Sequence, residues 1–150
     1  MSAQEYEVRG YGIQFDKHCG SNTTVDRIQA MLALAPEFKK RVDDYVDGFG
    51  LKPCELSVEE YEQFDEDYQC GIPALIAGVI NEYYNSNFVE AGLDDAGVLY
   101  LYIPQILPWQ CDDFMKNLSE CDACDILRKF YHMLYDNDVT LDNVSIRTFG

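Results

Sequence analysis

The most apolar run of the sequence lies at residues 97–109 and reads GVLYLYIPQILPW. Its first part, Val98 to Tyr102, contains no charge and consists of β-forming or apolar residues, and Pro104 follows closely. Such a run is typical of a buried β-strand. We therefore expect a strand at residues 97–103, with the rest of the chain packed against it.

Hydrophobic periodicity predicts the remaining elements. Residues of alternating character indicate strands at 5–15, 88–93 and 144–149, and glycines inside the first of these favour a kinked edge strand. Apolar residues at helical spacing predict about five helices, at residues 25–35, 37–47, 58–64, 73–84 and 119–134. This order predicts an α+β fold, in which a small, mainly antiparallel sheet of about four strands is covered by the helices. A chain of 150 residues is the size of one ordinary domain, so we expect a single domain, 1–150.

Short local signals mark where these helices begin. Thr23 or Thr24 precedes the first helix and suits an N-cap. Ser57, followed three residues later by Glu60, has the form of a capping box. Pro73 suits the first turn of the fourth helix, because proline has no N–H group to leave unpaired there.

The net charge of −16 is concentrated in the middle of the chain. Residues 43–125 hold 19 acidic residues and only two basic ones, Lys52 and Lys116, whereas the segments on either side are close to neutral. Such a charge repels nucleic acids and anionic membranes and attracts basic surfaces. No 18-residue apolar run and no signal peptide is visible, so we expect a cytoplasmic protein.

The densest group of carboxylates follows Ser57. Six of nine consecutive residues are acidic, namely Glu59, Glu60, Glu62, Asp65, Glu66 and Asp67. Like charges at helical spacing destabilise a helix by tenths of a kcal/mol per pair, so a use for them is worth considering. Because duplex DNA carries one charge per roughly 1.7 Å of axis, rows of carboxylates suit a groove built for phosphates. The hypothesis is a DNA mimic, and the alternative is a solvated face that promotes solubility.

Two further groups complete the predicted partner-binding surface. Asp94 and Asp95 lie between the two strands of the expected hairpin. Trp109, Asp112 and Asp113 follow the apolar run. Tryptophan on a bend is a frequent anchor of protein interfaces, and the alternative is that Trp109 covers the core.

Cysteine and histidine residues support a different class of function. Cys121 and Cys124 have C-x-x-C spacing, which occurs in zinc and dithiol sites, with His18, Cys19 or His132 as further ligands or partners. The alternative is that these are ordinary buried thiols. A chain of this size without a signal peptide favours reduced cysteines over disulfides.

No motif predicts a specific enzyme or cofactor. The sequence has no G-x-S-x-G, no P-loop and no H-E-x-x-H. A calcium loop that begins at Asp65 fails, because Cys70 and Ile76 stand where glycine and glutamate are required. We therefore predict no catalytic residue, no metal and no cofactor.

The segment YLYIPQILPWQ at residues 100–110, the helix near Ser119 and the closing Phe149 and Gly150 resemble small proteins of phages and integrated elements of gut Firmicutes. In that context small acidic proteins are often inhibitors of host defence, including anti-CRISPR proteins, and this is an analogy. The resulting hypothesis is a non-enzymatic phage protein that binds a basic nucleic-acid-binding protein, such as a CRISPR effector nuclease. A metal- or thiol-dependent enzyme using Cys121 and Cys124 and a phage structural or assembly protein remain as alternatives.

Overall fold

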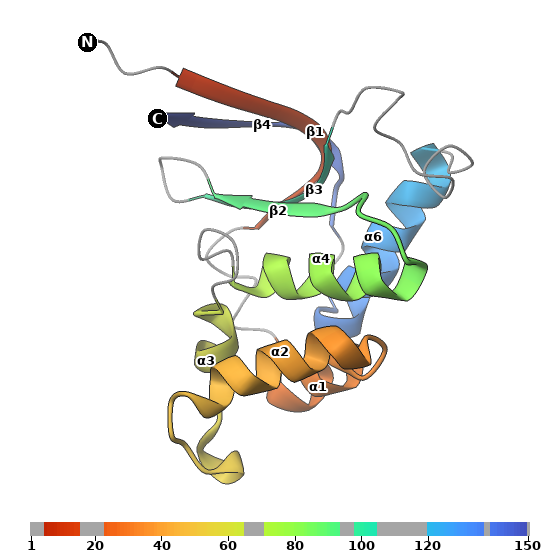
Figure 1. Ribbon diagram of the computed structural model, residues 1–150. Helices are drawn as coiled ribbons and strands as arrows, with labels where there is room; N and C mark the ends of the chain where they lie inside the picture. Colours follow the sequence, from red (N-terminus) through yellow and green to blue (C-terminus); the bar gives the residue numbers. More distant parts are fainter. Residues whose placement is uncertain are drawn as a thin grey trace.

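The computed structural model describes residues 5–15, 23–64, 71–93, 98–104, 120–136 and 139–149. Over these residues it contains four strands, β1 (Glu5–Phe15), β2 (Glu90–Leu93), β3 (Leu99–Pro104) and β4 (Asp142–Phe149). It also contains five α-helices, α1 (Val25–Leu32), α2 (Pro36–Asp47), α3 (Val58–Glu62), α4 (Gly71–Tyr84) and α6 (Glu120–Leu134). A short 3-10 helix, Pro53–Glu55, joins α2 to α3. The predicted α+β fold, with one antiparallel four-stranded sheet and helices packed on it, is confirmed (Figure 1).

The strands are ordered β2-β3-β1-β4, and every neighbouring pair is antiparallel. The prediction that β1 is an edge strand is wrong, because β1 pairs with β3 on one side and with β4 on the other. Its glycines have a packing role instead. A Cβ atom on Gly12 would overlap the carbonyl oxygen of Leu101, so glycine permits the backbone of β3 to lie against β1.

The sheet is curled, so its two edge strands approach each other across the concave face. The Cδ1 atom of Ile146 on β4 lies 2.7 Å from where a Cβ atom of Gly92 on β2 would be. In a flat sheet these strands would be about 14 Å apart, because neighbouring strands are spaced by about 4.8 Å. In Figure 1, β1 and β4 accordingly lie above β2, and β3 lies where the sheet turns.

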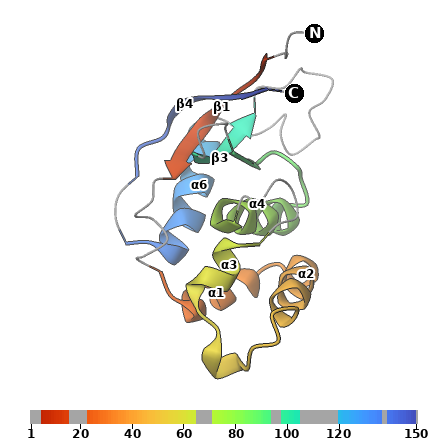
Figure 2. The same ribbon diagram turned by 90° about the vertical axis from the view of Figure 1, so that its left-hand side faces the viewer.

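The helices form two layers on the convex face of the sheet (Figure 2). α4 and α6 lie next to the strands, and α1, α2 and α3 lie beyond them. The first layer is held by ring contacts such as that between Phe15 of β1 and Tyr131 of α6, whose centroids are 5.8 Å apart. In the second layer, the ring of Phe38 on α2 occupies the space that a side chain on Gly78 of α4 would need.

Several helix and strand boundaries differ from the prediction by one to three residues. α4 begins at Gly71 and not at Pro73. Gly71 has a φ of +55°, which glycine adopts without strain, and its N–H donates to the carbonyl oxygen of Phe64 at 3.1 Å. β2 begins at Glu90 and not at residue 88. The side chain of Asn81 on α4 bonds both backbone groups of Val89, at 2.8 and 3.1 Å, so Val89 is held to the helix and not to a strand.

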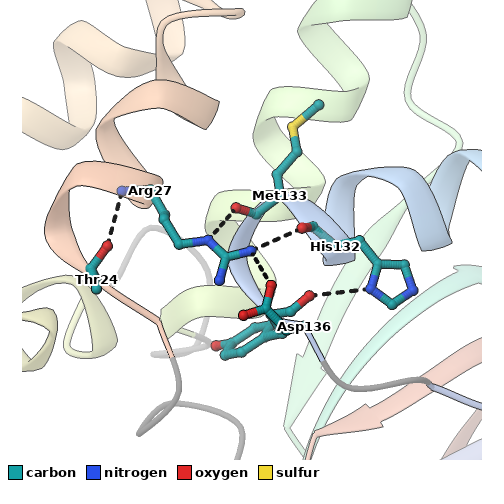
Figure 3. Close-up of polar contacts among 6 residues, drawn as sticks. Thr24, Arg27, His132, Met133 and Asp136 are labelled. Atoms are coloured by element: carbon teal, nitrogen blue, oxygen red, sulfur yellow. Dashed lines mark hydrogen bonds and ion pairs between the residues drawn. The ribbon is translucent and has the colours of Figure 1, made fainter.

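Arg27 fastens α1 to the C-terminal end of α6 (Figure 3). Its guanidinium donates to the backbone carbonyl oxygens of Met133, at 2.9 Å, and of His132, at 3.1 Å, and it lies 3.0 Å from Asp136. The last carbonyls of a helix have no partner within the helix, and a cation there is favourable. Thr24 caps α1, as predicted, by accepting a hydrogen bond from the backbone N–H of Arg27 at 3.3 Å.

Candidate functional site

The start of α2 is fixed by another helix. Its N-cap residue, Ala35, has no side chain that can cap the first turn. The carboxylate of Glu82 on α4 accepts hydrogen bonds from the backbone N–H groups of Glu37, at 3.3 Å, and Phe38, at 2.8 Å. A carboxylate at this position satisfies unpaired donors and matches the positive end of the helix dipole.

At the C-terminal end of α2, acidic residues oppose the helix dipole. After Glu37 in the first turn, three basic residues are followed by three acidic ones, in the order Lys39, Lys40, Arg41, Asp43, Asp44, Asp47. Asp44 and Asp47 occupy the last turn, which contains no basic residue. Because the C-terminal end of a helix is negative, each acid there costs about 0.3–1 kcal/mol at an exposed position.

α3 adds a second set of carboxylates, which have different roles. Glu60 accepts hydrogen bonds from the backbone N–H of Ser57, at 2.9 Å, and from its hydroxyl, at 2.5 Å. These bonds, first that from the hydroxyl, lower the pKa of Glu60. Glu60 therefore completes the predicted capping box, whereas Glu59 and Glu62 on the same helix are exposed.

The ionised form of Glu62 is disfavoured in the folded protein. Desolvation, and after it the negative charge of nearby Glu59, raises the pKa of Glu62. A raised pKa in the folded state means that folding favours the protonated form. At neutral pH the charge of Glu62 therefore lowers the free energy of unfolding.

Two tyrosines, Tyr61 buried and Tyr45 partly buried, hold α3 against α1 and the end of α2. Tyr61 is fully buried, and its hydroxyl is hydrogen-bonded by the side chain of Gln29 on α1. Tyr45 of α2 donates a hydrogen bond of 2.6 Å to the carbonyl oxygen of Gln63, just after α3, and its ring lies 5.3 Å from that of Phe64. Figure 1 shows α3 beside the C-terminal end of α2.

These contacts bring two helices that carry acids next to each other. The side-chain amide of Gln29 bonds both the hydroxyl of Tyr61 on α3 and, at 3.4 Å, the carboxylate of Asp43 on α2. Burial raises the pKa of Tyr61, and the negative charges of Asp43 and Asp47 act in the same direction. We group the exposed and partly exposed acids of the two helices as the acidic face and define it by five residues, Asp43, Asp44, Asp47, Glu59 and Glu62. Phe49, which follows α2, is 39 % exposed beside it, with its ring 5.6 Å from that of Tyr45.

The structure describes three of the predicted partner-binding residues, Glu59, Glu60 and Glu62. The others lie outside the described residues, namely Asp65, Glu66, Asp67, Asp94, Asp95, Trp109, Asp112 and Asp113. Asp43, Asp44 and Asp47 lie at the start of the segment 43–125 that was predicted to form the acidic binding surface, but they were not among the residues named for it. The signal was present, because acidic residues without a base in the last turn of a helix oppose its dipole.

The structure describes only two of the residues named for a thiol or metal site, Cys124 and His132. Cys124 is buried in α6, and His132 lies eight residues further along the same helix. Eight residues of helix span about 12 Å, which is too far for two ligands of one zinc ion. The side chain of Cys121 and the residues His18 and Cys19 lie outside the described part of the chain.

Within the described residues, no group of three or more histidine, cysteine, aspartate or glutamate side chains is placed to hold a metal ion. No helix in this part of the chain is long and apolar enough to cross a membrane. No family model matches the chain, and no curated protein or solved structure matches it at a significant level.

Proposed function

We propose that this chain is a non-enzymatic binding protein whose acidic face docks on a basic, nucleic-acid-binding protein in the cytoplasm. The observation that carries the proposal is the position of the carboxylates. Asp44, Asp47 and Glu62 are exposed acids at places where they lower the stability of the fold. A face that only promoted solubility would serve as well with acids at favourable positions, so the unfavourable ones support a role in binding.

The density of charge on α2 supports mimicry of DNA. Asp43, Asp44 and Asp47 lie within five residues, which correspond to about 6 Å of helix axis. The average separation along the axis is about 3 Å per carboxylate, and one of the three, Asp43, is ion-paired with Lys39. Duplex DNA carries one charge per roughly 1.7 Å, so a protein groove that binds phosphates would meet carboxylates on this helix at about half that density.

A variant of the acidic face tests the proposal. Asp44→Asn, Asp47→Asn, Glu59→Gln and Glu62→Gln together remove four charges and leave the capping role of Glu60 intact. The matched control removes four exposed acids elsewhere, with Asp26→Asn, Asp122→Asn, Asp125→Asn and Asp142→Asn. The two variants have the same net charge, so a difference between them reports position and not total charge.

The assay is affinity capture from a bacterial lysate, with proteins identified by mass spectrometry. We expect the wild type and the control to retain a basic nucleic-acid-binding protein that duplex DNA and moderate salt displace, and the acidic-face variant to lose it. The same variant should be at least as stable as the wild type in urea, because unfavourable charges are gone. Equal capture by both variants, or capture that DNA does not affect, would contradict the proposal.

A CRISPR effector nuclease is the specific candidate within this class, in line with a phage or mobile-element origin. Adding the purified chain to a DNA cleavage reaction of such a nuclease tests it directly. We expect inhibition that pre-formed nuclease–DNA complexes resist, because the acidic face and DNA compete for the same groups. Inhibition that is unchanged in the acidic-face variant would show a different mechanism.

A further inference from the structure

The junction of α1, α2 and α3 contains one polar side chain that bonds two of these helices at once. The amide Nε2 of Gln29 on α1 lies 3.4 Å from a carboxylate oxygen of Asp43 on α2 and is hydrogen-bonded to the hydroxyl of Tyr61 on α3. An amide nitrogen has two hydrogens to donate, so Gln29 serves both acceptors. Gln29 therefore links the two helices that carry the acidic face.

Asp43 differs from the other four residues of the acidic face. One oxygen of its carboxylate lies 2.5 Å from the ammonium group of Lys39, and the other accepts the hydrogen bond from Gln29. Both oxygens of Asp43 thus have partners within the chain, and its side chain is only 35 % exposed. Because the charge of Lys39 offsets that of Asp43, this carboxylate attracts a basic partner less than an exposed one does.

α3 depends on tertiary contacts for its position. It has only five residues, and helices shorter than about 12–15 residues are marginal in water unless packing holds them. The buried side chain of Tyr61 fixes it, and the hydroxyl of Tyr61 needs Gln29 as a partner, because an unpaired buried hydroxyl is unfavourable. The position of Glu59 and Glu62 on α3 therefore depends on a residue that is not itself acidic.

We propose that Gln29 is a positioning residue of the acidic face, which holds the carboxylates of α3 beside those of α2 through Asp43 and Tyr61. This inference rests on the proposed function and divides the face into two parts. Asp43 belongs to the support, and the docking charges are those of the four exposed acids, Asp44, Asp47, Glu59 and Glu62. A basic partner then meets carboxylates of two helices at a fixed separation.

Single variants separate support from docking. Gln29→Met keeps an unbranched side chain and removes both hydrogen bonds. Gln14→Met, at an exposed position of β1, makes the same chemical change away from the face and is its control. Asp43→Asn removes a charge and keeps an oxygen that accepts from Gln29. Asp44→Asn removes the same charge at an exposed position of the same helix.

The first measurement is the affinity of the intact chain for a fluorescent oligoarginine peptide, by fluorescence anisotropy in about 0.1 M salt. At that ionic strength charges more than about 10 Å apart are largely screened, so the peptide reports how closely the carboxylates are placed. We expect binding to weaken about threefold in Gln29→Met and in Asp44→Asn, and by less than about 1.5-fold in Asp43→Asn and Gln14→Met. Equal losses in Asp43→Asn and Asp44→Asn would overturn the assignment of Asp43 to the support.

The second measurement is the pH at which Tyr61 ionises, taken from the ultraviolet absorbance that each variant loses when Tyr61→Phe is added. Burial raises the pKa of Tyr61, and the hydrogen bond from Gln29 lowers it, while the charges of Asp43, Asp47 and Lys39 also act on it. Gln29→Met leaves those charges in place, so we expect the pKa of Tyr61 to rise further. A loosened fold would instead move this pKa down toward about 10, and that result would overturn the inference.

The inference and the proposed function fail in different ways. If the acidic-face variant binds the peptide as tightly as the wild type, or if the wild type does not bind it, the proposed function fails and the inference fails with it. If the acidic-face variant loses binding and Gln29→Met does not, the face docks without this support, and only the inference is overturned.

Discussion

The two faces of the sheet are buried in different ways. The convex face is covered by two layers of helices, and its core includes side chains from all three layers, such as Leu101, Phe130 and Phe38. The concave face holds a separate cluster of four buried residues, Tyr100, Tyr102, Val144 and Ile146. A sheet face can thus be removed from water by another layer or by the curvature of the sheet itself.

The curvature of the sheet requires glycine at particular positions of its concave face. Side chains on the concave face lie over Gly10 and Gly12 of β1 and Gly92 of β2, where a Cβ atom would overlap Tyr102 or Ile146. Glycine weakens a strand by leaving it without a side chain to pack, but here it makes room for a tyrosine from the neighbouring strand. The convex face depends on the size of its core, and the concave face depends on the absence of three side chains.

Removing a ring from the helical core should have the largest effect. Phe130 of α6 is fully buried and its ring lies 5.8 Å from Tyr83 and 6.2 Å from Tyr84. We expect Phe130→Ala to lower the free energy of unfolding by about 3–5 kcal/mol, measured in urea, because a large cavity remains. Val144→Ala on the concave face should cost less than half as much. Equal losses would show that the two faces contribute alike.

Replacing a glycine of the concave face by alanine, which adds a single methyl group, should have the next largest effect on stability. Gly12→Ala places a Cβ atom against the carbonyl oxygen of Leu101 and the backbone of Tyr102. We expect a loss of about 1–3 kcal/mol in urea unfolding, because β1 and β3 must separate to admit it. Gln14→Ala, two residues along the same strand and exposed, is the control and should change stability by less than about 0.5 kcal/mol. A neutral Gly12→Ala would contradict the close approach.

The contrast between the faces also explains what the sequence could predict. Periodicity located the helices and the capping box at Ser57, because these depend on residues close together in the chain. The interior position of β1 was not predictable, since glycine in a strand is equally consistent with an edge bulge and with close packing. Hydrogen bonds from Asn81 to Val89 and from Arg27 to Met133 are equally invisible in a local pattern.

In the candidate site, too, some features follow from local sequence and others depend on packing between helices. Glu59 and Glu62 were predicted as partner-binding residues from local charge density alone. Their combination with Asp43 and Asp47 depends on the packing of Tyr61 between helices, which spacing does not report. A local rule, the mismatch of acids with the dipole at the end of α2, would nevertheless have added Asp44 and Asp47 to the predicted surface.

A smaller effect tests the polar rim of the concave cluster. The hydroxyl of Tyr102 donates to the carboxylate of Glu90 on β2, at 3.1 Å. We expect Tyr102→Phe to cost about 0.5–1.5 kcal/mol in urea unfolding, because the bond lies partly in solvent. Glu90→Gln keeps an acceptor and should cost less. Glu90→Ala removes the acceptor, so a cycle of Tyr102→Phe with Glu90→Ala isolates the bond, and additive losses in that cycle would show that the bond does not contribute.

The smallest expected effect is a change in stability at high pH that depends on Tyr61 and is absent at neutral pH. Burial raises the pKa of Tyr61 above that of an unfolded tyrosine, about 10. A group with a raised folded-state pKa stabilises the fold fully below the unfolded value, and this contribution is lost as the pH rises through the folded value. The urea midpoint of the wild type should therefore fall above pH 10 more steeply than that of Tyr61→Phe.

Tyr83→Phe, which alters an exposed tyrosine of α4, is the control and should follow the wild type. Parallel curves for Tyr61→Phe and the wild type would show that Tyr61 ionises as readily in the folded protein as in the unfolded chain, and that the junction of α3 with α1 and α2 is open to water.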